Sequence, residues 1–398
     1  MANIEEMDQL RIQRIQNFKN VITGNGKIDH IPHFGNYWSW KYYDAGYKLS
    51  EALVDYDKMA DAMAQFFGRY PMDVCFEMGF RNPVKVAQHL GRDNDYIFDD
   101  RNYSISIKDQ CVIEDEDYDK LIANPEKFLW ESFLPKKYSV FTQEGNSIAF
   151  QEFISRFMEF GATLGRIVGI AGQYGMPSFA DPNDPTGATS FGYELLFSSL
   201  RGMKKLARDI RRMPDKVWAA CEALDSVVFN PSLERFRSGA MGSNPNTMVD
   251  MNPVMLGHIM LNPKQFEKFY WPYLQKIAQT AEEKDKLVFL FAEGSIAPYL
   301  EFFQELPKNR FAILSELDDV YEMKRALPNC VIAGGPGTDL LGGGTPEENI
   351  MYAQKLITEI GGNDHRFIFA PGKMISFPHD CKRENLSAIC QYLESIHY

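Results

Sequence analysis

The last third of the chain has a hydrophobic pattern that predicts alternating strands and helices. Short unbroken apolar runs recur between residues 286 and 372, and each ends at a polar or glycine-rich turn. Such runs suit strands that are buried on both faces of a parallel sheet. The segments between them carry apolar residues at helical spacing. The predicted strands are Lys286–Gly294, Arg310–Glu316, Asn329–Gly335 and Arg366–Gly372, and the predicted helices are Tyr299–Leu306, Asp319–Leu327, Pro346–Ile360 and Lys382–His397.

One of these helices has a start that the local sequence specifies. Thr345 offers an N-cap hydroxyl, Pro346 suits the first turn, and Glu348 completes a capping box. We therefore expect a helix to begin here, which supports a parallel βα repeat.

The first two thirds of the chain predict a similar alternation with one interruption. From Val84 to Ile113 apolar and polar residues alternate between turn residues, which indicates an antiparallel insertion. The other predicted elements are helices at 1–22, Val54–Tyr70, Glu116–Leu134, Ser147–Leu164, Tyr193–Leu224 and Pro263–Lys284, and strands at Asp29–Trp38, Met72–Met78, Arg166–Gly175 and Asn246–Pro253.

Together these elements predict an α/β fold, a (β/α)8 TIM barrel that forms a single domain over residues 1–398. Residues 1–28 would be an N-terminal helical cap, and residues 84–165 would hold the antiparallel β insertion. The eight expected strand centres are Ile31, Val74, Val168, Val249, Leu287, Phe311, Cys330 and Phe367.

Two segments of the first half predict ligand contacts, and each has a structural alternative. The aromatic stretch from Tyr37 to Tyr43 suits a wall for a planar ligand, or equally an aromatic cluster packed at the surface. The loop from Met176 to Phe191 is rich in proline and suits a substrate-facing flap, or an inert surface loop.

Composition narrows the class of protein. The apolar content of 45% supplies a large core, and 42 basic against 54 acidic residues give a net charge of −12. No basic block is long enough to follow a phosphate backbone, so we expect no nucleic-acid partner. The acidic first residues and the lack of any apolar run near about 20 residues predict neither a signal peptide nor a membrane span. Six scattered cysteines without a CxxC motif suit reduced thiols in a cytoplasmic protein.

The active site of such a barrel lies at the carboxyl ends of its strands. Glu293 and Glu316 end neighbouring strands, so we expect them to reach one ion or one proton together. A single strand-end carboxylate has a plain alternative as a helix N-cap or a solvated group, and Lys373 is either a cation for an anionic substrate or a surface lysine. The predicted catalytic residues are Glu293, Glu316 and Asp250, and the predicted substrate-binding residues are His33, Asn36, Tyr37, Trp38, Glu77, Gln173, Tyr174, Lys373 and His379.

Five sequence motifs resemble the uroporphyrinogen decarboxylase superfamily, whose members are (β/α)8 barrels. The resemblance is strong from Pro253 onward, whereas the first half is more similar to the corrinoid-dependent methyltransferases, including aryl methyl ether O-demethylases. Two motifs of true uroporphyrinogen decarboxylases, an N-terminal arginine-rich motif and a late histidine motif, are not evident. The motifs that carry the resemblance are Phe289–Ser295, Val331–Leu341, Gly344–Asn349, Phe367–Gly372 and Arg383–Ala388.

The resemblance implies a methyltransferase that moves a methyl group from a small methylated substrate, expected to be an aryl methyl ether, to the Co(I) corrinoid (cobalamin) of a separate carrier protein. Related methyltransferases hold zinc through His-x-Cys and a later Cys, but here Phe291, Glu293 and Lys373 stand in those places. Zinc would then depend on Glu293 and Glu316, with a histidine or water. Two alternatives stay open, a carboxy-lyase for a small carboxylate or tetrapyrrole and a non-catalytic corrinoid- or tetrapyrrole-binding protein. A homodimer also fits.

Overall fold

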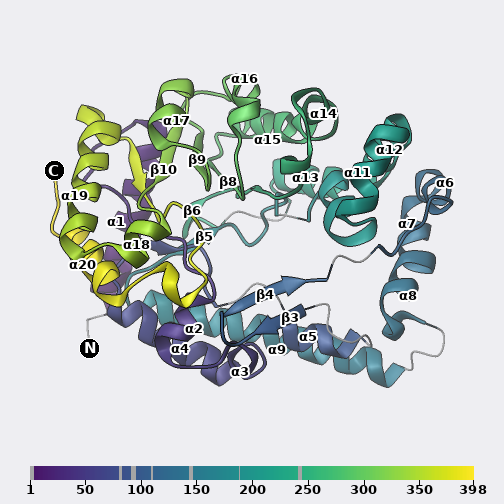
Figure 1. The fold of residues 1–398 in the computed structure, drawn as a ribbon, viewed down its shortest axis with the longest axis horizontal. Helices are drawn as coiled ribbons and strands as arrows, with labels where there is room; N and C mark the ends of the chain where they lie inside the picture. The colour runs from purple at the N-terminus through teal and green to yellow at the C-terminus, as the bar shows by residue number, and fades with distance from the viewer. Residues whose placement is uncertain are drawn as a thin grey trace.

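The chain forms parallel β-strands surrounded by helices (Figure 1). The computed structural model describes residues 4–79, 83–90, 96–108, 111–142, 147–187, 189–240 and 244–398. The strands are β1 (Phe34–Gly35), β2 (Val74–Cys75), β3 (Tyr96–Asp99), β4 (Ser104–Ile107), β5 (Ser178–Ala180), β6 (Thr247–Val249), β7 (Val254–Met255), β8 (Val288–Ala292), β9 (Phe311–Ser315), β10 (Val331–Gly334) and β11 (Phe367–Phe369).

The helices make up most of the remainder. Three α-helices are extended by π-helical turns at Leu129–Phe133, Leu196–Leu200 and Ile357–Gly361. The α-helices are α1 (Ile4–Thr23), α2 (Trp40–Ala45), α3 (Leu49–Ala52), α4 (Tyr56–Arg69), α5 (Val84–Ala87), α6 (Asp117–Ala123), α7 (Pro125–Phe128), α8 (Leu134–Lys137), α9 (Ser147–Gly172), α10 (Gly192–Leu195), α11 (Met203–Arg212), α12 (Pro214–Val227), α13 (Phe229–Arg237), α14 (Pro263–Phe269), α15 (Trp271–Glu283), α16 (Leu300–Phe303), α17 (Val320–Ala326), α18 (Thr338–Gly343), α19 (Pro346–Leu356) and α20 (Arg383–Glu394).

The four predicted βα units of the last third are confirmed. Strands β7 to β11 form one parallel sheet in sequence order, and every residue of β8 and β9 is buried. Burial on both faces explains why these strands appear in the sequence as unbroken apolar runs. The capping box at the start of α19 is also present, with the Glu348 amide donating to the Thr345 hydroxyl and the Thr345 amide donating to the Glu348 carboxylate.

The parallel strands follow a circular order that is interrupted at one place. β1 continues the sheet beyond β11 through the pairing of His33 with Phe369, and β2 pairs with β1. On the other side, Met251 pairs with Val288 and joins the β6 segment to β8, while β5 pairs with β6. No backbone ladder links β2 to β5 in the described part of the chain. The predicted α/β class with parallel strands is therefore confirmed, but the strands form an open ring and not a closed barrel.

Helix α1 closes the end of the ring where the strands begin. Its buried side chains Phe18 and Val21 pack in one cluster with Phe289, which points into the ring from β8. Arg366, just before β11, donates to the carbonyl oxygens of Val21 and Ile22 at 3.1 and 2.8 Å. The predicted N-terminal helix therefore seals the amino end of the ring, and we call the opposite, carboxyl end the mouth.

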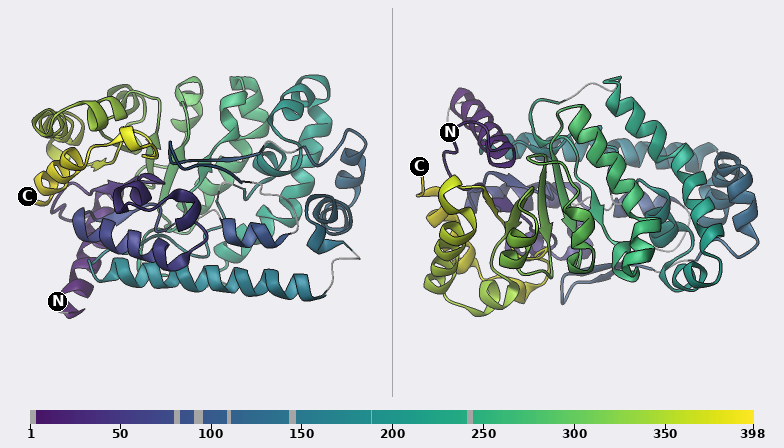
Figure 2. Two further views of the ribbon diagram at one scale, coloured as in Figure 1. Left: turned by 60° about the horizontal axis from the view of Figure 1, so that its bottom comes forward. Right: turned by 90° about the horizontal axis from the view of Figure 1, so that it is seen from above.

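Helix α9 overturns one strand prediction. Residues 147–172 form a single helix of 26 residues, and Figure 2 shows it as one long rod. The β-branched run at Arg166–Gly175 suggested a strand, but Phe160, Ile167 and Ala171 have helical spacing and are buried beside α4. The parallel strand at this place in the order is β5, within the segment that we expected to be a flap.

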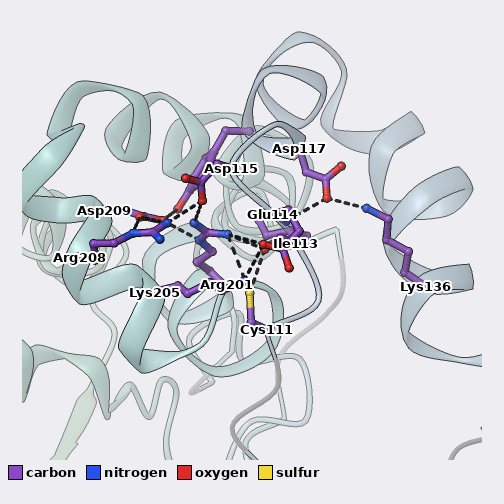
Figure 3. Close-up of polar contacts among 11 residues, drawn as sticks. Cys111, Ile113, Glu114, Asp115, Asp117, Lys136, Arg201, Lys205, Arg208 and Asp209 are labelled. Carbon is purple, nitrogen blue, oxygen red and sulfur yellow. Dashed lines mark hydrogen bonds and ion pairs between the residues drawn. The ribbon is translucent and has the colours of Figure 1, made fainter.

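The insertion contains the predicted antiparallel pair, β3 with β4, followed by helices α6 to α8. A buried arginine fastens this region to the helices after α10 (Figure 3). Arg201 is 0% exposed, and its guanidinium bonds Asp209 at 2.6 Å, the Ile113 carbonyl at 2.7 Å and the Asp115 carboxylate.

Over the described residues, no helix combines the length and apolar character that crossing a bilayer requires.

Candidate active site

Polar side chains meet at the mouth because alternate residues of a strand face the same side. Phe34, Phe289, Phe291 and Leu314 share the apolar cluster inside the ring. Two places further along their strands stand Asn36, Glu293 and Glu316, which the same alternation directs toward the interior. Phe76, Leu256 and Met374 are only partly buried and pack on the apolar cluster from the same end. The mouth therefore combines an apolar floor with carboxylate and amide groups.

Glu293 and Glu316 occupy neighbouring strand ends, as predicted. The Glu316 amide donates to the Ala292 carbonyl at 3.2 Å, and both side chains are partly buried. Burial raises the pKa of Glu316, while the Met374 amide, which donates to its carboxylate at 2.8 Å, and the charge of Lys373 act to lower it. Glu316 is thus a carboxyl group that holds a proton more readily than an exposed glutamate does.

Asn36 is a second predicted residue at the mouth. Its side chain is 0% exposed, and neither amide atom has a hydrogen-bond partner among the described residues. Its backbone carbonyl accepts from the Ile375 amide at 3.0 Å. Buried amides are nearly always hydrogen-bonded, so this side chain is suited to receive a polar group of a ligand.

Glu194 is a site residue that the sequence analysis missed. It lies in α10, is 0% exposed, and accepts three hydrogen bonds on Oε1, from the amides of Leu256 and Gly257 and from the Tyr270 hydroxyl, at 2.7 to 2.9 Å. Its other oxygen, Oε2, has no partner in the described chain. Burial, reinforced by the nearby charge of Glu293, raises the pKa of Glu194 to about 7.

The sequence analysis also missed His258, which follows Gly257 just after the end of β7. Its ring is 0% exposed, and burial lowers its pKa to about 4, which keeps the imidazole neutral. Neither ring nitrogen has a well-formed hydrogen bond within the described residues. A Cβ on Gly294 would stand 3.9 Å from its Nε2, which places the imidazole beside the Glu293–Gly294 turn. Both missed residues lie in apolar runs, where a sequence pattern predicts only core.

The comparisons with known proteins agree with this fold. The family model for uroporphyrinogen decarboxylase (URO-D) matches residues 193–395, slightly more than half of the chain. The chain belongs to the URO-D family. A solved structure, a methyltransferase from Methanosarcina mazei, is similar with a TM-score of 0.59 and 13% identity, over 96% of this chain and 98% of that one. At this identity the likeness concerns the fold, and no curated protein matches.

The URO-D match contains the carboxylates of the mouth and His258, whereas Asn36 and Glu77 lie outside it. Glu77 lies two residues after the end of β2 and is 5% exposed. Its carbonyl accepts from the Lys41 ammonium and from the Cys75 thiol. The backbone carbonyl of Glu77 therefore helps to hold the buried Lys41 in place.

Lys373 and His379 lie in the loop after β11, near the mouth. The Lys373 ammonium is 3.5 Å from an Asp380 oxygen and 5.3 Å from the centre of the Phe377 ring. His379 is exposed and stacks on the same ring at 5.7 Å. The Lys373 ammonium is close enough to Glu316 to affect its pKa, but it is already paired with the Asp380 carboxylate.

Two predicted residues lie at the other end of the ring. Asp250 follows β6, but the kink before β7 sets it level with the start of β8, where it accepts from the Leu287 amide at 2.8 Å and pairs with Lys286 at 2.9 Å. His33 precedes β1 and lines a cavity between the strands and helices α1 and α20. The prediction that these two side chains face the mouth is wrong. The sequence pattern does not locate the end of a strand that is short or kinked.

The predicted aromatic and amide contacts also lie elsewhere. Tyr37 is 1% exposed and packs against Phe66 at 5.3 Å, outside the ring, and Trp38 packs on that same outer cluster. Gln173 and Tyr174 follow the end of α9, and the Tyr174 carbonyl accepts from Arg14 at 2.8 Å. Tyr37, Gln173 and Tyr174 therefore support the helical layer and do not form walls of the mouth.

Proposed function

We propose that this URO-D family member is a methyltransferase that moves a methyl group from an aryl methyl ether to the corrinoid of a separate carrier protein. The observation that carries the proposal is the composition of the mouth, which combines Glu316, a carboxyl group with a raised pKa, with the apolar side chains Phe76, Phe291 and Met374. An aromatic ether is apolar and uncharged, and its departing oxygen needs a proton. The methyltransferase with the same fold is consistent with the proposal but does not establish it.

The reaction needs an acid more than it needs a nucleophile. When bound, the reduced corrinoid supplies the nucleophile for the methyl carbon. The bond between that carbon and the ether oxygen breaks, and its electron pair stays on the oxygen. Glu316 would give its proton to this oxygen, so that a phenol leaves and a carboxylate remains. Asn36 would orient the substrate through its unpartnered amide. Glu194 would keep negative charge low around Glu293 below pH 7, where it is mostly protonated.

Zinc is the metal that the resemblance implies, and the donor atoms at the mouth suit it. Glu293 and Glu316 offer carboxylate oxygens and His258 offers a neutral imidazole, all of which zinc accepts. Over the described residues, no three ligand atoms from this group lie within 4.8 Å of one another, so binding would require side-chain rotation. A zinc ion held there would supply a Lewis acid for the ether oxygen.

The test is a methyl-transfer assay with free cob(I)alamin as acceptor and a panel of methoxybenzenes as donors. Wild-type protein should release phenol and bleach the Co(I) absorption, and Glu316→Gln should slow the reaction by about 10² to 10⁴. The control variant is His89→Gln. His89 lies in a short helix after α5, far from Glu316 in the sequence. If no donor of the panel reacts in the presence or absence of zinc, the proposal fails.

The alternative of a carboxy-lyase has less support. It requires a cation that holds the substrate carboxylate, and we expected Lys373 to serve. Its ammonium is already engaged with Asp380. Release of carbon dioxide from a carboxylate without any corrinoid would nevertheless decide for this alternative. We also retain, as a proposal, the closed (β/α)8 barrel that the sequence predicts.

A further inference from the structure

A second group of chemically active side chains lies at the sealed end of the ring, away from the mouth. A cavity of about 210 Å³ opens there between α1, the segments before β1 and β2, and α20. Its lining includes His30, His33, Asp73 and His397 beside apolar residues. Nothing in the proposed methyl transfer uses these residues, so they need their own explanation.

Asp29, His30 and His397 bring three ligand atoms together within 4.8 Å of one another. An Asp29 carboxylate oxygen lies 3.4 Å from Nδ1 of His30 and 3.1 Å from Nδ1 of His397. Tetrahedral zinc with bonds of about 2.1 Å separates its ligand atoms by about 3.4 Å. The spacing therefore matches a metal site, although hydrogen bonds from both rings to Asp29 would give similar distances.

The surroundings of His30 favour a metal ligand. Its other nitrogen, Nε2, lies 2.9 Å from an Asp73 carboxylate oxygen, and Asp73 is only 6% exposed. Histidines that bind metals usually donate their second ring N–H to a carboxylate, which fixes the tautomer with the ligating nitrogen free. The Asn17 side-chain amide approaches Nδ1 at 3.5 Å but donates a shorter bond, 2.9 Å, to the His30 carbonyl.

A second observation points to a ligand in the same cavity. His33 is 3% exposed and lines the cavity, yet neither of its ring nitrogens has a well-formed hydrogen bond in the described chain. Burial lowers its pKa to about 4, so the ring is neutral and offers a nitrogen lone pair. A buried imidazole without a partner is expected to face water or a bound group.

We propose that Asp29, His30 and His397 bind one divalent transition-metal ion, with zinc as the expected metal. Two imidazoles and one carboxylate form a donor set that zinc accepts, with water completing the coordination from the adjoining cavity. The ion joins the segment before β1 to the residues after α20, which are 368 positions apart. It is independent of the methyl transfer at the mouth.

The test counts zinc in the full chain after chelation, reloading and gel filtration. His397→Gln and Asp29→Asn should each lose one zinc equivalent per chain, and both side chains are more than half exposed, so the variants should fold. His89→Gln is the matched control and should keep the wild-type count. In wild-type protein loaded with Co(II), the visible absorption of a nitrogen-ligated ion should appear, and it should be missing from His397→Gln.

Zinc should also raise the unfolding temperature of the wild type and of His89→Gln by more than it raises that of His397→Gln, which could keep only zinc bound at the mouth. A Glu293→Gln variant separates the two ends of the ring, since it would remove only zinc held at the mouth. The proposal is overturned if His397→Gln and Asp29→Asn retain the wild-type zinc count and its thermal shift. Loss of methyl transfer with normal zinc binding at this end would instead overturn the proposed function alone.

Discussion

Replacing Glu194 by Gln should make the stability of the protein less dependent on pH. The pKa of Glu194 is raised from 4.5 to about 7, chiefly by burial and then by Glu293. Between these values the folded chain binds more protons than the unfolded chain, so stability is highest below pH 4.5 and falls as pH rises. Linkage with these two values gives a loss of about 2 to 3 kcal/mol between pH 5 and pH 8.

The glutamine keeps the group that matters for packing. Its amide oxygen can accept the three hydrogen bonds that Oε1 now accepts from Leu256, Gly257 and Tyr270. Its nitrogen replaces Oε2, which has no partner in the described chain, and this should cost about 1 to 3 kcal/mol at every pH. Glu194→Ala, in contrast, leaves all three donors unpaired and should lose roughly 3 kcal/mol or more.

The assay is urea unfolding of metal-free protein at pH 5, 6, 7 and 8, with the free energy of unfolding compared between wild type and Glu194→Gln. All other titrating groups are common to both proteins, so the difference between the two pH profiles isolates Glu194. The wild type should lose about 2 to 3 kcal/mol more than the variant from pH 5 to pH 8. Parallel profiles would refute the argument, since they would show that Glu194 has an ordinary pKa in the folded protein.

Three further stability predictions follow from single contacts, each measured by urea unfolding at constant pH. Arg201→Met leaves the buried Asp209 without its main counter-ion and should cost about 3 to 5 kcal/mol; a loss below 1 kcal/mol would contradict this. Gly335→Ala would place a Cβ 2.0 Å from a backbone oxygen after β11 and should cost about 3 kcal/mol, whereas Gly343→Ala, with open space around it, should cost under 1 kcal/mol. Thr345→Ala removes the N-cap of α19 and should cost about 1 kcal/mol, with no change in the activity assay.

The sequence predicted the elements whose local and tertiary preferences agree. Strands β8 to β11 are buried on both faces, so their unbroken apolar runs correctly indicated buried strands. The capping box of α19 depends only on neighbouring residues, so the sequence alone was enough to predict it. Residues 166–172 show the opposite case. Their β-branched side chains favour a strand, but the helix that precedes them continues through Gly172 because its apolar face packs on α4.

The candidate site was only partly predictable for a related reason. Glu293 and Glu316 follow long strands, so their position at the mouth could be inferred from the strand pattern alone. Glu194 and His258 lie in apolar runs, and their role depends on contacts between segments that are far apart in the sequence, such as the bond from the Gly257 amide to Glu194. Asp250 was misplaced because the chain kinks between β6 and β7, which no residue pattern announced.

The missing ladder between β2 and β5 gives the molecule a seam. Among the described residues, each of these two strands has one edge that does not pair with another strand. The ring can therefore open or close here with the smallest loss of hydrogen bonds. Amide hydrogen exchange should therefore be faster in β2 and β5 than in β8 and β9. If a small molecule draws the edges of β2 and β5 together, amide exchange in these strands should slow. Exchange in β2 and β5 can therefore be used to detect substrate binding without knowledge of the reaction.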